Sequence, residues 1–218
     1  MVSQSFLFTE DKILDKLYNA AINYKNLYNI AYKVKLGRKG KTYNFILHFP
    51  PESFFHLVGM QHLVDLTFSS KNKERIFKDV LKHDIDMEFL KKSFYYDKWH
   101  IDDRIDNLYL LETMLEGQDS LTYKINQNDY KRFSTITADY LIQYTCENIF
   151  YLFVVKQKES DDTFDDEHRA CSFFKKYDKD YTQHTMKSTL LTLSKISNFR
   201  DPDQIEEEIY RNPAYKEC

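Results

Sequence analysis

The sequence contains only four glycines in 218 residues, namely Gly37, Gly40, Gly59 and Gly117. No two of them are spaced as G-x-G, and no G-x-x-x-x-G-K-[ST] segment is present. Dinucleotide-binding fingerprints and P-loops both require such glycines, because a side chain would keep the backbone away from the phosphates. The sequence therefore excludes the nucleotide-fold enzymes that depend on these loops.

Cysteines and long apolar runs are scarce as well. Cys146, Cys171 and Cys218 are odd in number and far apart, and no C-x-x-C pair occurs. A disulfide scaffold and a cysteine zinc site are therefore not expected, and we predict a reducing, cytoplasmic location. The N-terminal MVSQSFLFTEDK lacks the basic and apolar regions of a signal peptide. No apolar stretch approaches 18 residues, so we expect no membrane span.

Aromatic residues, in contrast, are abundant, with 17 Tyr, 17 Phe and one Trp. At this length the chain can bury a sizeable core without disulfides. We predict a single α+β domain over residues 1–200, with a helical insert at about 70–117 and an acidic C-terminal tail at 201–218.

Charge is unevenly distributed along a chain whose formal net charge is −3. No acidic residue occurs between Asp15 and Glu52, while the acidic residues gather in DDTFDDE (161–167) and in the tail. The basic residues of the acid-free stretch are Lys16, Lys25, Lys33, Lys35, Arg38, Lys39 and Lys41. This asymmetry predicts a patch that faces a polyanion such as RNA, DNA or a nucleotide, although a solvated hairpin without a ligand would look the same.

Hydrophobic periodicity predicts helices, a hairpin and then strands. AYKVKL and YNFILHF flank GRKG, which predicts a β-hairpin with Gly37 or Gly40 at positive φ. The expected helices are one within residues 6–30 beginning at Thr9, one over 51–66, and three over 73–83, 86–96 and 98–117, the last ending at Gly117. The expected later strands are 121–126, 138–145, 148–157, 170–177 and 184–196. The tail is predicted to be a peripheral helix or partly ordered.

No metal site is expected from the spacing of the ligands. His56 and His62 lie about 240° apart on a helix, so they cannot share a face. The acidic loop lacks the glycine and ligand order of a calcium loop. Asp102 and Asp106, one turn apart, could hold Mg²⁺, or they could be surface carboxylates that pair with Arg104 or Lys98.

Two segments contain residues suited to phosphate chemistry. Gly59 lies three residues after His56 in the predicted helix FFHLVGMQHL, where glycine is costly, so a ligand or backbone could approach the imidazole. The alternative is a core histidine bonded to a carbonyl, with Gly59 serving helix packing. The last two strands combine basic, hydroxyl and aromatic groups that suit a phosphodiester or an unstacked base. These are Ser172, Phe173, Phe174, Lys175, Lys176, His184, Lys187, Ser188 and Thr189.

Together these segments resemble a known family. They are the basic hairpin, F-x-H-L-x-G-x-x-x-L from Phe54 to Leu63, NIFYLFVVKQ, CSFF and STLLTLSKI. Over about Tyr32 to Ile196 the chain resembles the fourth of the phage-borne Barnase–EndoU–colicin–RelE-like nuclease families. The resemblance implies an α+β fold with N-terminal helices and the β-hairpin packed on a curved antiparallel sheet of about four strands.

The resemblance also implies metal-independent RNA cleavage of a toxin or phage-conflict type, in which a 2′-hydroxyl attacks the adjacent phosphate and no cofactor takes part. His56 would be the acid or base, Lys35 or Lys187 the cation, and Ser172 and Thr189 the hydrogen-bond donors. The expected RNA-binding residues are Lys33, Arg38, Lys39, Lys41, Lys175 and Lys176. A neutralising protein partner would be compatible with this activity. Two alternatives remain, a non-catalytic binding module on the same scaffold and an interaction protein whose acidic tail imitates nucleic acid.

Overall fold

The computed structural model describes residues 15–117, 119–157 and 167–216. Its strands are β1 (Ile30–Arg38), β2 (Lys41–His48), β3 (Ser120–Ile125), β4 (Tyr140–Thr145), β5 (Ile149–Lys156), β6 (Glu167–Lys175), β7 (Thr185–Ser197) and β8 (Ile205–Arg211). Its α-helices are α2 (Lys16–Lys25), α3 (Ser53–Leu57), α4 (Lys73–Leu81), α5 (Met87–Leu90), α6 (Ile101–Asp106), α7 (Leu110–Glu116) and α8 (Gln127–Tyr130), and two 3₁₀ turns are η1 (Met60–His62) and η2 (Asp97–Trp99).

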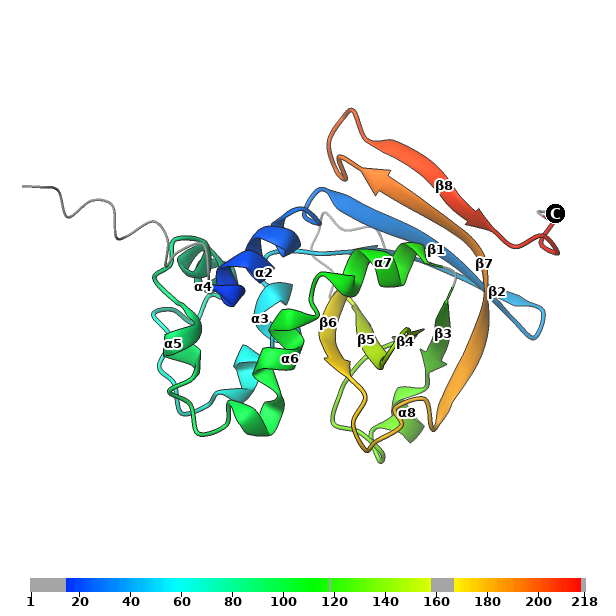
Figure 1. Cartoon of the computed structure of the whole chain (residues 1–218). Coiled ribbons are helices and arrows are strands. Elements are labelled where there is room, and N and C mark those ends of the chain that lie inside the picture. Colours follow the sequence, from blue (N-terminus) through cyan, green and yellow to red (C-terminus); the bar gives the residue numbers. More distant parts are fainter. Residues whose placement is uncertain (1–14, 118, 158–166, 217–218) are drawn as a thin grey trace, which may run out of the picture.

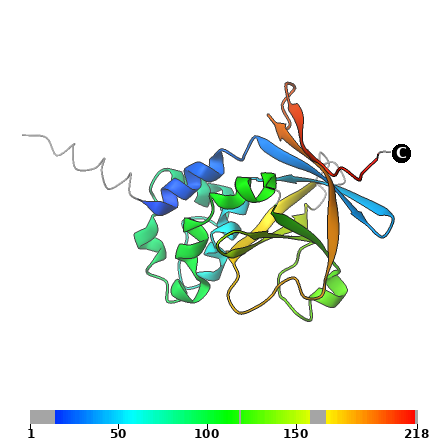
Figure 2. The same ribbon diagram turned by 45° about the vertical axis from the view of Figure 1, so that its right-hand side comes forward.

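Seven of the strands close into a mixed β-barrel in the order β1-β2-β6-β5-β4-β3-β7, and β7 returns to pair with β1. All pairings are antiparallel except that of β2 with β6. The helices α2 to α6 gather at one side of the barrel (Figure 1). A second view shows β7 running the height of the barrel with β8 against its upper part (Figure 2).

The predicted fold, an α+β arrangement on a curved antiparallel sheet of about four strands, is therefore wrong. The reason is the length of β7. Its residues Thr185–Ser188 pair with β3, whereas Thr189–Ser197 continue beyond β3 and pair with β1. This single strand joins the N-terminal hairpin to the later strands, so the sheet closes and the hairpin becomes part of it instead of packing on it.

The hairpin itself is confirmed, and so are the five later strands, apart from small shifts at their ends. Lys39 and Gly40 form a two-residue turn with φ of 48° and 74°, and positive φ at both positions is typical of a type I′ turn. Gly40 is thus the hairpin glycine at positive φ. The acidic tail also differs from the expectation, because β8 pairs with β7 from Ile205 onward as an added strand.

The helices in the structure are shorter than those predicted from the hydrophobic periodicity. The predicted start at Thr9 lies outside the described residues, and within them α2 begins after Asp15, whose side chain accepts from the Leu17 N–H. The expected helix over 51–66 is wrong, because α3 ends at Leu57 and Gly59 adopts a left-handed conformation with φ of 83° before η1. Likewise the expected helix over 98–117 divides into α6 and α7. We find no helix in the described ranges with the length and apolar character of a membrane span.

Alternate residues of β5 show how the core is divided. Phe150, Leu152 and Val154 belong to a large buried cluster shared with the helices, whereas Tyr151 and Phe153 belong to a smaller second cluster. Successive side chains of a strand point to opposite faces. Both faces of this part of the sheet are therefore covered, and the second cluster includes residues of α8 and of the segment after β6.

Gly59 makes a testable contribution to stability. A Cβ there would lie 2.9 Å from Arg104 Cδ and 2.9 Å from Ile101 Cδ1, in addition to the strain of positive φ. The left-handed conformation alone costs a non-glycine residue about 1–2 kcal/mol. We expect Gly59→Ala to lower the free energy of unfolding by more than that, as measured by urea denaturation. Gly40→Ala is the matched control, because Gly40 also has positive φ but no atom within 4 Å. Equal losses in the two variants would contradict the close packing at Gly59.

Candidate nucleic-acid pocket

A hollow on the described chain lies beside β6, at the point where β6 separates from β2. The two strands pair only from Glu167 to Arg169, and beyond that point α3 and α6 pack against β6. The hollow has a volume of about 740 Å³ and is lined from segments 56–62, 98–104, 133–137 and 171–181. We call it the β6 pocket. Its volume is in the range of sites that hold small ligands.

Arg104 provides a buried positive charge in this pocket. It is 7% exposed, and it donates from Nε to the Trp99 carbonyl (3.2 Å) and from Nη1 to the Phe173 carbonyl (3.1 Å). The second bond occupies a β6 carbonyl beyond the stretch that pairs with β2. No described carboxylate forms an ion pair with Arg104. Burial lowers its pKa to about 10, so the guanidinium stays charged at neutral pH.

His56 lines the same pocket from α3. Its Nε2 accepts a hydrogen bond from Lys73 Nζ (2.7 Å), so in this arrangement the proton of the neutral ring is on Nδ1. Burial, followed by the charges of Lys73 and Arg169, lowers the pKa of His56 to about 4. The imidazole is therefore neutral at pH 7, and in this arrangement Lys73 occupies its acceptor nitrogen.

His62 lies close to His56 and packs flat against Trp99. The two ring centroids are 3.9 Å apart with an interplanar angle of 10°, and Gln61 Nε2 donates to His62 Nε2 (3.1 Å). Burial and then Arg104 lower the pKa of His62 to about 4. Two neutral imidazoles thus line the same pocket as Arg104, whose charge acts on His62.

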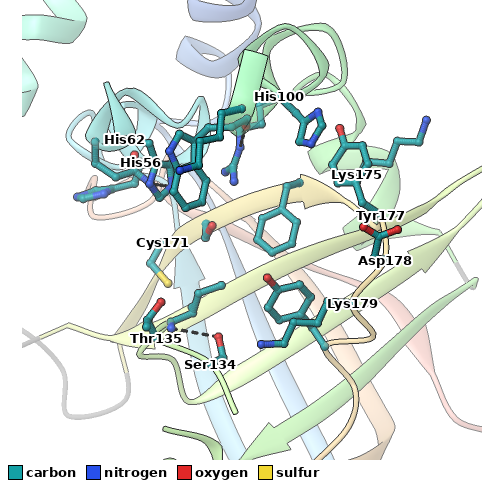
Figure 3. A pocket seen from close by; sticks show the side chains of 18 of the residues that line it. His56, His62, His100, Ser134, Thr135, Cys171, Lys175, Tyr177, Asp178 and Lys179 are labelled. Carbon is teal, nitrogen blue, oxygen red and sulfur yellow. Dashed lines mark hydrogen bonds between the residues drawn. The ribbon is translucent and has the colours of Figure 1, made fainter. Parts of the chain in front are cut away.

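A second stacked pair forms another part of the wall. His100 and Tyr177 have ring centroids 3.8 Å apart at 18°, and the Tyr177 hydroxyl donates to Asp103. Figure 3 shows His56 and His62 close together, His100 next to Tyr177, and Ser134 on the facing wall. The pocket therefore has ring surfaces in two places.

The charge of the lining is strongly positive. Lys98, Lys175 and Lys179 join Arg104, whereas Asp178 is the one carboxylate among the described lining residues. Hydroxyl groups of Ser134, Thr135 and Ser172 add neutral hydrogen-bonding capacity. Such a combination suits an anionic ligand that also presents flat rings.

The structure brings together only part of the predicted site. His56, Ser172 and Lys175 line the β6 pocket, and Lys176 lies next to it in sequence and pairs with Asp180 (3.5 Å). Lys187 and Thr189 line a separate hollow of about 300 Å³ beside β7 and β8. The predicted set Lys35, Lys187 and Thr189 is therefore not in the same pocket as His56, because Lys35 lines a third hollow beside β1.

The basic hairpin also lies away from the pocket. Arg38, Lys39 and Lys41 are at its tip, on the other side of the barrel from α3 and α6 (Figure 1). Lys33 pairs with Glu206 of β8 (3.1 Å), and Lys35 Nζ donates to the Tyr215 hydroxyl (3.3 Å). The acidic strand β8 thus neutralises part of the basic stretch, which the charge pattern alone could not show.

The carboxylates proposed as magnesium ligands have another partner. Asp102 and Asp106 lie 3.8 Å and 2.8 Å from Lys16 Nζ, respectively, and so pair with α2 rather than with Arg104 or Lys98. Over the described residues, no group of three or more His, Cys, Asp or Glu side chains is arranged to hold a metal ion.

Sequence reasoning missed several residues of the pocket, above all Arg104, Trp99, His100 and Tyr177. The first three lie in WHIDDRID, a segment that the sequence analysis considered only for its carboxylates as metal ligands. The signal present in the sequence was a Trp-His pair followed by an arginine. The residues that these side chains contact, Tyr177 for His100 and Phe173 for Arg104, are distant in sequence and could not be inferred.

The two low histidine pKa values predict a pH dependence of stability. Each ring stays neutral in the folded protein down to about pH 4, whereas in the unfolded chain it takes up a proton near the ordinary value of 6.5. Between these values the unfolded state binds more protons, so this stabilisation is complete above pH 6.5 and is lost as the pH falls towards 4. We expect His56→Gln/His62→Gln to lose less stability than the wild type between about pH 7 and pH 5 in urea denaturation. An equal loss in both proteins would contradict this prediction.

A buried arginine, neutral histidines, lysines and stacked rings line one pocket, and these are groups that suit a nucleic-acid ligand. The chain belongs to the phage-Barnase-EndoU-ColicinE5/D-RelE like nuclease4 family, whose model matches residues 16–208. The predicted family is thus confirmed, and because it is a family of nucleases it supports a nuclease function with a nucleic-acid substrate. No curated protein and no solved structure matches the chain significantly.

Proposed function

We propose that this nuclease is a metal-independent endoribonuclease and that the β6 pocket is its active site. The observation that carries the proposal is Arg104, a buried guanidinium without a carboxylate partner among the described residues, in the same pocket as two neutral histidines. A fixed cation stabilises charge that develops on a phosphate, and neutral imidazole accepts a proton near pH 7. RNA supplies the 2′-hydroxyl that this chemistry needs.

In the proposed reaction, the substrate phosphate binds to Arg104 and draws the Lys73 ammonium away from His56. His56 Nε2 then accepts the proton of the 2′-hydroxyl as its oxygen attacks phosphorus, and the bond from phosphorus to the 5′ oxygen breaks. The products are a 2′,3′-cyclic phosphate and a 5′-hydroxyl. His100 lines the same pocket and is the candidate for giving a proton to the leaving 5′ oxygen.

Ser172 and Lys175 retain their proposed roles as hydrogen-bond donor and RNA-binding cation, because both line this pocket. Lys35, Lys187 and Thr189 are not included in the catalytic set, and the hairpin lysines are proposed only as distant contacts to a longer RNA. A role in conflict between phage and host, acting in the cytoplasm, is part of this proposal. Such an activity against cellular RNA would call for a neutralising protein partner.

A second candidate function is a non-catalytic RNA-binding module. It is favoured by one observation, that Lys73 already occupies His56 Nε2. Both functions predict that RNA binds in the β6 pocket. Only the first predicts that the RNA is cleaved.

The deciding experiment is incubation of the purified protein with total RNA, tRNA and DNA, each with and without EDTA. We expect RNA to be cleaved equally in both conditions, DNA to stay intact, and the products to end in cyclic phosphate. Cleavage that EDTA abolishes would contradict the metal-independent mechanism. Binding without cleavage of any RNA would favour the non-catalytic module.

A further inference from the structure

Two aromatic side chains in the β6 pocket are held in the same unusual way. Trp99 and Tyr177 each lie flat against a histidine from another segment, at 3.9 Å and 3.8 Å between ring centroids. Both nevertheless remain partly open, with Trp99 37% and Tyr177 39% exposed. A single imidazole covers at most one face of each ring. The stacked histidine therefore fixes the ring orientation while leaving surface for a ligand.

The backbone and Arg104 link these two rings. Trp99 and His100 are consecutive residues, yet each stacks on a different partner, and His100 has φ of 51°, which is uncommon for a residue other than glycine. Arg104 Nε donates to the Trp99 carbonyl, and its charge acts on both His62 and Tyr177. One cation is thus close to both stacked pairs.

We propose that the β6 pocket binds an unpaired dinucleotide step, with one base stacked on Trp99, the next base on Tyr177, and the phosphate between them on Arg104. This inference rests on the proposed function and names its substrate class, single-stranded RNA. In a duplex each base is already stacked on its neighbours and paired at its edge. Consecutive bases can occupy two separate rings only where the strand is unpaired and splayed apart.

The spread of charge supports the same binding mode. Lys98 adjoins Trp99 in sequence, and Lys175 lies two residues before Tyr177, so each proposed base position has a lysine nearby in the lining. These lysines can contact the phosphates on either side of the bound step. Stacking on aromatic rings tolerates every base because each base has a π-face. The site should therefore prefer unpaired RNA to duplex RNA, with little dependence on the base sequence.

The fluorescence of Trp99 can test this inference, because Trp99 is the one tryptophan in the chain. The full-length protein is titrated with a 2′-O-methyl oligoribonucleotide, which cannot be cleaved, and with the blunt duplex of the same sequence. We expect the single strand to quench the tryptophan fluorescence and the duplex to leave it unchanged. An oligonucleotide with two adjacent abasic positions serves as a further probe and should bind more weakly than the complete strand.

Loss of either ring should weaken binding of the single strand by about 5- to 150-fold. Tyr177→Leu is followed by the Trp99 signal, and Tyr109→Leu is the matched control, because Tyr109 is 60% exposed but does not line the β6 pocket. With cleavable RNA, Trp99→Leu should raise KM more than it lowers kcat, and Trp99→Phe should restore most of the loss.

The expected result is quenching by the single strand alone, with weaker binding for Tyr177→Leu and unchanged binding for Tyr109→Leu. Equal quenching by the duplex, no quenching, or unchanged binding for Tyr177→Leu would overturn the proposal. Cleavage is measured on the same preparations. A protein that cleaves RNA without quenching would refute the stacking site alone, whereas one that quenches without cleaving would refute the proposed catalysis alone.

Discussion

Replacing Arg104 with methionine is expected to lower the rate of RNA cleavage by about 10²- to 10³-fold at neutral pH, the usual cost of removing one charged donor from a transition state. Methionine keeps an unbranched apolar stem that can pack over Gly59 and Ile101, while the guanidinium is lost. The measurement is the single-turnover rate with a short single-stranded RNA in excess protein. The large effect follows from burial, because a cation shielded from water acts on a phosphate with little screening.

The Arg104 result needs a control for folding, since its side chain also bonds to the carbonyls of Trp99 and Phe173. The unfolding midpoint of each variant is measured with the rate. Arg104→Lys keeps a charge in the pocket and should retain more activity than Arg104→Met. Arg38→Met removes a hairpin arginine outside the pocket and should change the rate by less than about threefold. A folded Arg104→Met protein that cleaves at the wild-type rate would remove Arg104 from the mechanism.

The strands could be predicted from sequence because each is a local pattern, but their closure into a barrel could not. Ile30 pairs with Ser197, near the other end of the chain, and no local feature of either segment specifies that partner. The strand β8 was hidden for a different reason. Its three consecutive glutamates, Glu206–Glu208, do not alternate with apolar residues. They pair with β7, and Glu206 also forms an ion pair with Lys33.

The site shows a similar division between local and distant information. His56 could be singled out from the sequence because Gly59 is unusual in its surroundings, although the reason for Gly59 is a left-handed turn and not a gap in a long helix. Arg104 was missed because an arginine between aspartates in WHIDDRID resembles an exposed helix face. Its burial depends on α6 packing against the part of β6 that has no β2 partner, which only the tertiary structure reveals.

His56→Ala is expected to reduce RNA cleavage by about 10²- to 10⁴-fold, the usual contribution of a general base. The single-turnover assay used for Arg104 gives the rate, and urea denaturation tests whether the protein is folded. His62→Ala is the matched control for removal of a half-buried imidazole from the same pocket, and it separates loss of the base from general damage to the site. Equal, small effects of both substitutions would contradict a specific role for His56.

Lys73→Met tests the same assignment through the pH dependence. The base must be unprotonated to act, so the acidic limb of kcat/KM in the wild type should follow the free-protein pKa of His56, about 4. Lys73 is one cause of that low pKa, and removing its charge raises the pKa towards 6.5. The acidic limb should therefore move to higher pH in Lys73→Met, and the variant should be less active than wild type at about pH 5. An acidic limb that stays in place would show that a group other than His56 accepts the proton.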